Sequence, residues 1–412
     1  MNLLTVDTLE EAREKLISCV KTLPCPTESV TLDRAVHRVL ATDVVAQDNI
    51  PHFRRSTVDG YAVIASDTQG ASESIPTFLT VVEEIHIGKK PTKTITSGQC
   101  TYVPTGGMIP DGATAMVMVE YTEQFHDGEI AVYQSVAEGS SIVLVGEDAK
   151  SNTLLLTKGT VLKTAQVGVL AAAGIWSVPV YRPWRISILS TGDELVHPSD
   201  TLESAQVRDV NTWALNALAS QCQFQVTSHQ TIPDHAELLR QELEHAKEES
   251  DFVLTSGGSS QGKADVTCQI MNDVCDHGVM THGLSLKPGK PTILAFDERS
   301  KTIMMGLPGH PVASLMVFQS LLVWLWKEYT HQPPAKSFWG FTTTNIPGAP
   351  GKTTLIPVKL QLSHEHQYEV TPIFGKSGLI NTLTDADGYV MLDRNQEGLQ
   401  KVAWVEVHLF GV

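Results

Sequence analysis

Cysteine is scarce in this 412-residue chain, and its six cysteines form neither a C-x-x-C pair nor a regular framework. A fold held together by disulfides and a structural zinc site are therefore both disfavoured. Cys268 and Cys275 fall on one predicted helix, and their spacing favours a shared buried face over chemistry.

Long hydrophobic runs and an excess of basic residues are also missing. The longest apolar stretches, residues 167–180 and 312–326, are interrupted and fall short of the ~20 residues that span a bilayer. The N-terminus has no basic segment before an apolar core, as a secretory signal would have, so we expect a cytoplasmic protein without a membrane partner. With 30 Lys and Arg against 46 Asp and Glu, the formal net charge is -16, which argues against nucleic acid as a partner.

The pattern of apolar residues changes several times along the chain, as expected for a protein of roughly two to four domains. Thr8 and Glu11 form a capping box that predicts a helix over residues 8–21. Strands alternate with helices over residues 183–330, which predicts a parallel sheet covered on both faces. The predicted domains are an elongated N-terminal domain (1–49 and 141–181), an inserted β-rich domain (50–140), an α/β domain (182–331) and a C-terminal β domain (332–412).

Three loops of the α/β segment follow apolar strands and are rich in small residues. They are STGDE (190–194), TSGGSSQGKAD (255–265) and GLPGHPVAS (306–314). In a doubly wound sheet such strand ends share one edge, where ligands bind. Backbone N–H groups in a Gly-rich loop before a helix can bind an anion, although a tight connection is the plainer alternative. Lys287 and Lys290, on a Pro-Gly scaffold, add two cations and favour phosphate or another oxyanion as the ligand.

Carboxylates stand in these loops at Asp193, Glu194 and Asp265, and further along the chain at Asp209. Carboxylates beside phosphates repel them unless a divalent cation lies between, so Mg²⁺ is the expected cofactor. The alternative is structural: Asp209 and Asp265 would cap helices, and Glu194 would be a solvated loop acid.

With these loops assembled, the chain resembles the MoeA family, the molybdopterin molybdenumtransferases that include the E domain of gephyrin. Four further motifs in the family's order carry the resemblance over nearly the whole length. They are STVDGYAV (56–63), PTGGMIPDGA (104–113), GED (146–148) and LKPGKP (286–291). The resemblance implies a multidomain α/β plus β fold, with a doubly wound α/β molybdopterin-binding domain, an inserted β-rich domain, an elongated N-terminal domain and a C-terminal β-barrel.

The resemblance also implies an activity. The family inserts molybdate into adenylylated molybdopterin and releases AMP in a Mg²⁺-dependent step, in a homodimer whose active site is shared between subunits. Carried over by motif, the catalytic residues are Asp59, Asp148, Glu194 and Asp265, of which Glu194 and Asp265 are the Mg²⁺ ligands. The substrate-binding residues are Thr105, Gly106, Thr191, Gly192, Gly257, Gly258, Ser259, Lys287, Gly289, Lys290, Pro308, Gly309 and His310. Asp59, Thr105, Gly106 and Asp148 would come from the partner chain.

Three positions depart from the family pattern: Arg54 stands where an acid is usual, Lys263 where Glu is usual, and His310 where Asn is common. Each change adds positive or titratable character, so we expect an altered affinity for anions. Tungstate in place of molybdate stays open. So do three alternatives: a MogA-like adenylyltransferase activity, a gephyrin-like scaffold, and a catalytically degenerate relative. A separate MogA-like adenylyltransferase is a candidate partner.

Overall fold

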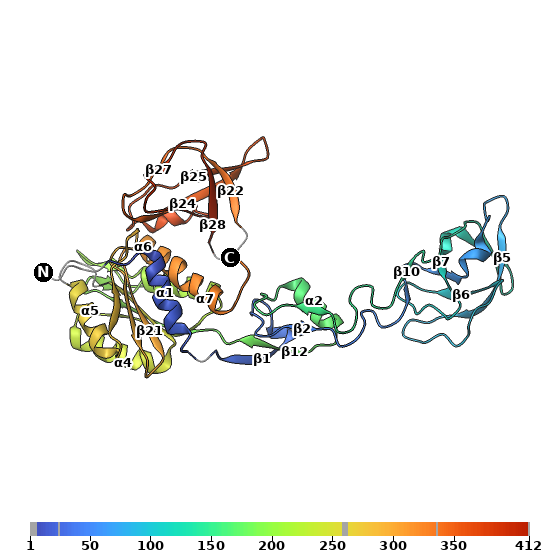
Figure 1. The fold of residues 1–412 in the computed structure, drawn as a ribbon, viewed down its shortest axis with the longest axis horizontal. Helices are drawn as coiled ribbons and strands as arrows, with labels where there is room; N and C mark the ends of the chain where they lie inside the picture. Colours follow the sequence, from blue (N-terminus) through green and yellow to red (C-terminus); the bar gives the residue numbers. More distant parts are fainter. Residues whose placement is uncertain (1–5, 24, 258–262, 335–336, 411–412) are drawn as a thin grey trace.

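The computed structural model describes residues 6–23, 25–257, 263–334 and 337–410. The molecule is elongated, with an α/β unit and a β-barrel at one end, a thin arm, and a β unit at the far end (Figure 1). None of the described helices is both long and apolar enough to cross a membrane.

The α/β unit is built on a six-stranded sheet whose four central strands are almost wholly buried. Its order is β16 (Gln225–Ile232), β13 (Arg185–Thr191), β17 (Phe252–Gly257), β21 (Thr302–Leu307), β20 (Ile293–Asp297) and β18 (Val279–His282). One face packs against α3 (Asn211–Gln221) and the helical run α6 (Pro311–Val317), η4 (Phe318–Val323) and α7 (Trp324–Tyr329). The other face packs against α4 (Ala236–Glu249) and α5 (Lys263–Val274). The doubly wound α/β fold is therefore confirmed.

The sheet is mixed, however, where the strand and helix alternation predicted a parallel one. Strand β20 runs antiparallel to β21, because a short turn joins the two strands as a hairpin. In this turn the buried Asp297 carboxylate accepts hydrogen bonds from the N–H and the hydroxyl of Ser300. Burial alone would raise the pKa of Asp297, but these hydrogen bonds and Lys247 lower it to about 2.

The first helix, α1 (Leu9–Val20), begins at the predicted capping box, where Thr8 and Glu11 bond to each other's backbone N–H. We expected this helix in the elongated domain, but it packs on the α/β unit. Leu9, Ala12 and Leu16 are fully buried in the same core as the sheet, and the Arg13 guanidinium donates to the Ser320 carbonyl. The apolar face of α1 is therefore covered by the α/β unit rather than by the core of the arm.

The arm consists of paired chain segments from both sides of the inserted β unit. Strand β1 (Thr27–Thr31) pairs with β12 (Ser177–Tyr181), and β2 (Val44–Val45) pairs with β11 (Leu154–Leu156). Helix α2 (Thr164–Ala172) and the short η1 (Leu32–Arg34) complete it around a small core.

The distal β unit has a six-stranded sheet in the order β7 (Ala115–Met118), β4 (Gly60–Val63), β6 (Gln99–Val103), β5 (Thr77–Glu84), β9 (Glu129–Val132) and β8 (Thr122–His126). Asp127 and Gly128 form the predicted turn of the β8 and β9 hairpin. The chain enters and leaves through β3 (Arg55–Ser56), which pairs with β10 (Ile142–Val143). Short helices η2 (Ala65–Thr68) and η3 (Val119–Tyr121) lie beside the sheet strands in sequence.

The C-terminal region forms a closed five-stranded barrel, as expected. Its strands are β24 (Thr353–Leu362), β25 (Tyr368–Pro372), β22 (Phe338–Thr342), β28 (Trp404–Leu409) and β26 (Gly388–Leu392), and β24 closes the barrel by pairing with both β25 and β26. Strand β19 (Leu286–Lys287) of the α/β unit adds to β24, so the two units share a sheet. The remaining short elements are β14 (Leu195–Val196), β15 (Val207–Arg208), β23 (Ile346–Pro347), β27 (Gly398–Leu399) and η5 (Ile380–Leu383).

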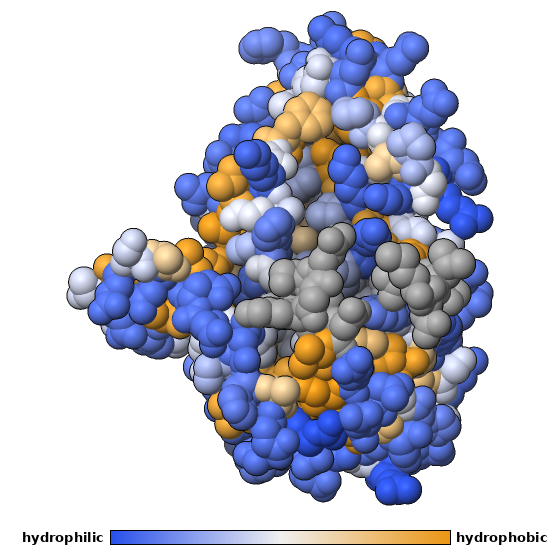
Figure 2. Space-filling model, turned by 90° about the vertical axis from the view of Figure 1, so that its left-hand side faces the viewer, coloured by the Kyte–Doolittle hydropathy of each residue, from blue (hydrophilic) through white to orange (hydrophobic). Residues whose placement is uncertain are grey.

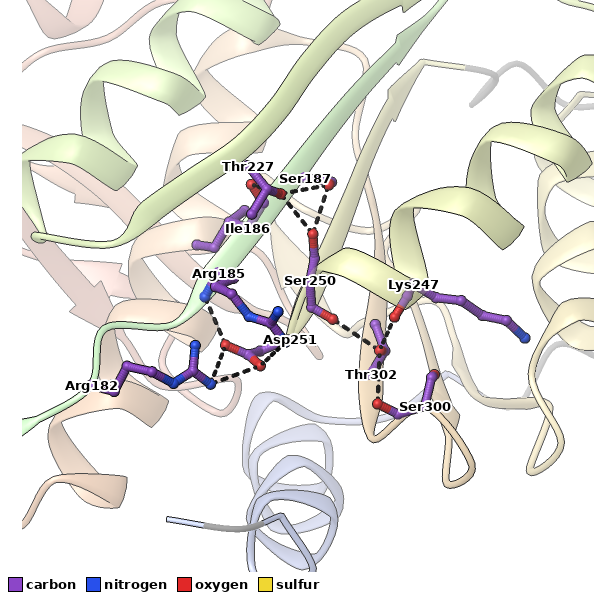
Figure 3. Close-up of polar contacts among 10 residues, drawn as sticks. All are labelled: Arg182, Arg185, Ile186, Ser187, Thr227, Lys247, Ser250, Asp251, Ser300 and Thr302. Atoms are coloured by element: carbon purple, nitrogen blue, oxygen red, sulfur yellow. Dashed lines mark hydrogen bonds and ion pairs between the residues drawn. The ribbon is translucent and has the colours of Figure 1, made fainter. Parts of the chain in front are cut away.

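One carboxylate joins the arm to the sheet. Asp251, just before β17, accepts hydrogen bonds at 3.1 Å from the guanidinium groups of Arg182 and Arg185 and one at 2.8 Å from the Arg185 N–H (Figure 3). Arg182 directly follows β12 of the arm, whereas Arg185 begins β13. Beside it, the hydroxyls of Ser187, Thr227 and Ser250 bond to one another.

We predict that Asp251→Ala lowers the free energy of unfolding by about 2 kcal/mol, because it leaves two partly buried guanidinium groups without their acceptor. Urea denaturation at pH 7 measures this. The matched control is Asp273→Ala, which removes the exposed pair with Arg240 and should change stability by less than about 0.5 kcal/mol. Equal effects of the two substitutions would show that Asp251 is no special anchor.

Candidate active site at the sheet edge

The pairing register of the α/β sheet brings four loops to one edge. Thr191 at the end of β13 pairs with Gly257 at the end of β17, and Ser256 pairs with Leu307 at the end of β21. Ile293, which begins β20, pairs with Gly306 at the same edge, because β20 runs the opposite way. The loop of Lys287 and Lys290, which precedes β20, therefore meets the three loops that follow β13, β17 and β21.

Position 257 at this edge requires glycine, because there is no space for a side chain. Its φ is +109°, and a Cβ there would lie 2.0 Å from the carbonyl oxygen of its neighbour Thr191. The backbones of β13 and β17 thus approach closely just where the Gly-rich loop begins. Gly258 and Ser259 lie outside the described residues. Lys263 and Asp265 lie in the first turn of α5, but their side chains are outside the described part of the chain.

A buried polar network holds the strand ends together below the edge. The Asp209 carboxylate accepts hydrogen bonds from the N–H of Thr212 at 3.0 Å, its hydroxyl at 2.6 Å and the Thr231 hydroxyl at 2.5 Å. The Thr212 hydroxyl also contacts Ser190, which contacts Ser256. Asp209 is only 3% exposed, so it caps α3 and links β13 to β16. Of the two roles considered for it, metal or phosphate chemistry and a structural cap, the structure favours the cap.

The two neighbouring acids face outward. Asp193 accepts a hydrogen bond from the N–H of Asp234 at 3.0 Å, which fixes the loop after β13 against the start of α4. Glu194 is exposed, and its carboxylate lies beside Gly192, with Oε2 2.9 Å from where a Cβ of that glycine would be. Among the described residues no group of three His, Cys, Asp or Glu side chains could hold a metal ion. The Mg²⁺ pair of Glu194 and Asp265 stays a prediction.

A cavity of about 780 Å³ lies between the barrel and two of the four edge loops, residues 286–291 and 308–313. Thr191, at the end of β13, instead lines a smaller cavity of about 220 Å³ beside the start of α4. The α/β unit contributes Lys287, Gly289, Lys290, Pro308, Gly309 and His310, all predicted to bind substrate. The barrel contributes Lys352, Phe374 and Ser377 among others. The side of the molecule drawn in Figure 2 is mainly hydrophilic, with a hollow between the barrel above and the α/β unit below.

Sequence reasoning missed the barrel's share of this cavity. Lys352 adds a third cation to Lys287 and Lys290, yet no motif marked it. Only the strand pairing reveals it. Strand β19 carries Lys287 and pairs with β24, so that Lys287 lies opposite Thr354, two residues from Lys352.

Two side chains fix the loop after β21. The amide nitrogen of Asn211 donates to the Gly309 carbonyl at 2.8 Å, and Nδ1 of His310 lies 2.7 Å from the Ser377 hydroxyl. The Val312 N–H also donates to the Ser377 carbonyl at 3.1 Å. His310, expected only to add titratable character, therefore also links the loop to the barrel.

The remaining predicted residues lie in or next to the distal β unit, at the far end of the molecule from the cavity (Figure 1). An Asp59 carboxylate oxygen accepts hydrogen bonds from the N–H of Thr105 at 2.7 Å and its hydroxyl at 3.1 Å, and the Gly106 N–H donates to the Ser56 carbonyl at 2.8 Å. Asp148 is exposed where the arm meets the distal unit, and its N–H donates to the Ile50 carbonyl. Within one chain the arm separates all four residues from the sheet-edge cavity.

Arg54 has a structural role that the sequence did not suggest. Its guanidinium donates to the carbonyls of Ala113 at 2.9 Å and Pro110 at 3.1 Å, so it ties down the loop over residues 104–113. The charge gained at this position is therefore partly committed to backbone acceptors.

The fold and the edge cavity together define a class of protein. It is a multidomain α/β protein in which lysines of the α/β unit and of the barrel line one cavity. Comparison with known proteins gives the family. Three family models match: the MoeA N-terminal region (domain I and II) over residues 7–174, the probable molybdopterin binding domain over 187–327, and the MoeA C-terminal region (domain IV) over 341–410. The chain belongs to the MoeA family of molybdopterin molybdenumtransferases.

Individual relatives agree over the full length. The chain is 30% identical to the molybdopterin molybdenumtransferase of Haemophilus influenzae over 98% of both chains. It is 31% identical to that of Bacillus subtilis, over 93% of this chain and 90% of the relative. A crystal structure of the molybdopterin biosynthesis MoeA protein from Pyrococcus horikoshii OT3 matches with a TM-score of 0.81 at 28% identity, over 98% of this chain and 100% of that one.

We predict that Arg54→Gln raises amide hydrogen exchange at Gly106, Ile109 and Ala113 by about 5-fold or more, because the loop loses two charge-assisted hydrogen bonds. Exchange followed by mass spectrometry measures this. The control is the adjacent, exposed Arg55→Gln, which should leave the same amides unchanged. Unchanged exchange in both variants would contradict a structural role for Arg54.

Proposed function

We propose that this protein inserts molybdate into adenylylated molybdopterin with release of AMP, in a Mg²⁺-dependent step. The observation that carries the proposal is the edge cavity, where Lys287, Lys290 and Lys352 line one space together with Pro308 and Gly309 after β21. Molybdate, phosphate and the phosphoanhydride are all anions, and three cations in one cavity suit them.

The edge loops suggest a division of roles. The pterin and its phosphate would lie along Thr191, Gly192 and the loop from Gly257 to Ser259, where small residues let a ligand approach the backbone N–H groups. Pro308 and Gly309, held by Asn211, would close the other side. The lysines would offset charge that develops as the phosphoanhydride breaks.

Mg²⁺ fits the chemistry of the acids at this edge, because it prefers carboxylate oxygens and phosphate oxygens together. Glu194 and Asp265 would hold it, and the ion would supply charge neutralisation at the pyrophosphate. Glu194 supports this role by being exposed at the edge rather than committed to a buried network.

A homodimer with shared sites is part of the same proposal. Helix α2 exposes Ala165, Gly168, Ala171 and Ala172, and Leu170 is the residue of this helix that is buried. Nearby Trp176 is 65% exposed. A second copy would cover this apolar face of the arm, and Asp59, Thr105, Gly106 and Asp148 of one chain would then face the crevice of the other.

The activity is tested by AMP release from adenylylated molybdopterin. We expect release that depends on molybdate, falls on removal of Mg²⁺ with EDTA and returns when Mg²⁺ is added. A parallel series with tungstate tests the second oxyanion. ATP-dependent adenylylation of molybdopterin would instead support the MogA-like alternative, and the absence of both reactions would support a scaffold or a degenerate relative.

If a MogA-like adenylyltransferase supplies the substrate, adding one with ATP and molybdopterin should replace the purified adenylylated compound. No AMP release in this coupled assay, despite activity on the purified substrate, would count against that partner.

The shared site is tested with heterodimers purified through two different tags. Asp59→Asn and Lys290→Ala should each lower kcat/KM by about 10²-fold as homodimers, because each damages both sites. The heterodimer of these two variants should regain roughly half of the wild-type activity, since one site is then intact.

The matched control is the heterodimer of Asp59→Asn with Asp148→Asn. Both changes fall in the distal half, so each site keeps one damaged residue and activity should not return. Recovery in neither heterodimer would argue that the site is built within one chain.

A further inference from the structure

The distal unit carries a concentrated basic segment that the proposed site does not yet use. Residues 86–93, with the sequence HIGKKPTK, hold three lysines within five positions of a chain whose net charge is -16. We call this segment the lysine loop. Lys89 and Lys90 are both exposed, and no ion pair among the described residues involves either of them.

The register of the distal sheet places the lysine loop beside Asp59 and Thr105. Strands β5 and β6 are parallel, with Glu84 opposite Tyr102, so the loops that follow them leave the sheet at the same edge. Gly60, which begins β4, pairs with Val103 at the end of β6. Asp59, the loop over residues 104–113 and the lysine loop therefore share one edge.

The lysine loop and the 104–113 loop are also packed together. The Ile95 N–H, just after the lysine loop, donates to the Asp111 carbonyl at 3.0 Å. A Cβ on Gly112 would lie 2.2 Å from the Ile95 carbonyl oxygen, so the two backbones are in close contact. Ile85, Ile95 and Ile109 belong to one buried cluster beneath both loops.

The lysine loop is braced rather than loosely attached. The Glu83 carboxylate accepts hydrogen bonds from the N–H and hydroxyl of Thr92 and from the N–H of Lys93, all between 2.7 and 3.1 Å. The Lys89 N–H closes a turn by donating to the His86 carbonyl at 3.0 Å. These bonds fix the backbone that carries Lys89 and Lys90, which lowers the entropic cost of holding an anion there.

We propose that Lys89 and Lys90 bind the anionic part of the substrate at the site shared with the partner subunit and raise its rate of capture. This inference rests on the proposed function for the substrate and for the dimer. A protein of net charge -16 repels an anionic substrate over the ~10 Å range of its field, and a pair of lysines on a braced backbone, at the edge that carries Asp59 and Thr105, reverses this locally. The alternative is that Lys89 and Lys90 are solvated surface lysines that contact no ligand. Replacing them would then leave the capture of substrate unchanged.

The test compares two double variants of equal charge. Lys89→Gln/Lys90→Gln should lower kcat/KM by about 10-fold at low ionic strength, chiefly through KM, and the loss should shrink in about 0.5 M salt. Lys21→Gln/Lys401→Gln, with both changes exposed on the α/β unit and the barrel, should lose less than about 2-fold. Lys89→Arg/Lys90→Arg should retain most of the wild-type value.

A binding measurement separates this inference from the proposed function. We expect inorganic pyrophosphate to bind the wild-type dimer by calorimetry and to bind the Lys89→Gln/Lys90→Gln dimer about 10-fold more weakly, with unfolding temperatures unchanged. If the wild type releases no AMP but this difference in binding persists, the anion-binding role of the lysine loop is supported and the proposed reaction is wrong. Equal binding and equal kcat/KM for both double variants, or no pyrophosphate binding by the wild type, would overturn the inference.

Discussion

The direction of one strand determines where the loops of the candidate site come together. Because β20 runs against its neighbours, its beginning lies at the edge where β13, β17 and β21 end. The chain that leads into it, with Lys287 and Lys290, is thereby brought to the edge where the other predicted loops lie, and β19 within it pairs with β24 of the barrel. With a parallel β20, the lysines would emerge at the opposite edge and the barrel would have no strand to join.

Local signals in the sequence located elements better than they located contacts. The capping box of Thr8 and Glu11 correctly marks the start of α1, yet it contains nothing about which surface α1 covers, since that depends on the size of apolar faces far away in the chain. Asp209 illustrates the same limit within the site. An acid three residues before a helical N–H is equally compatible with a cap and with a ligand, and only its burial beneath Thr212 and Thr231 decides.

Long-range contacts explain the remaining differences. Lys352 has no motif, because its role depends on β24 pairing with β19, some distance back along the chain. The charge of Arg54 predicted a change in anion affinity. In the structure its guanidinium donates to two carbonyls of a loop more than fifty residues away. Both cases show that the charge of a side chain gives its chemistry but not its partner.

The arm adds a constraint of a different kind, because two distant segments of the chain pair to form it and both set its length. Strands β1 and β12 pair in antiparallel register from Thr27 with Tyr181 to Thr31 with Ser177, although the whole distal unit separates them in sequence. An insertion in one strand alone would slip this register and turn its buried side chains outward. Lengthening β1 and β12 while keeping their register therefore takes matched changes in two distant segments, whereas β2 and β11 show the other route, a bulge between Leu154 and Leu156 that takes up an extra residue in one strand.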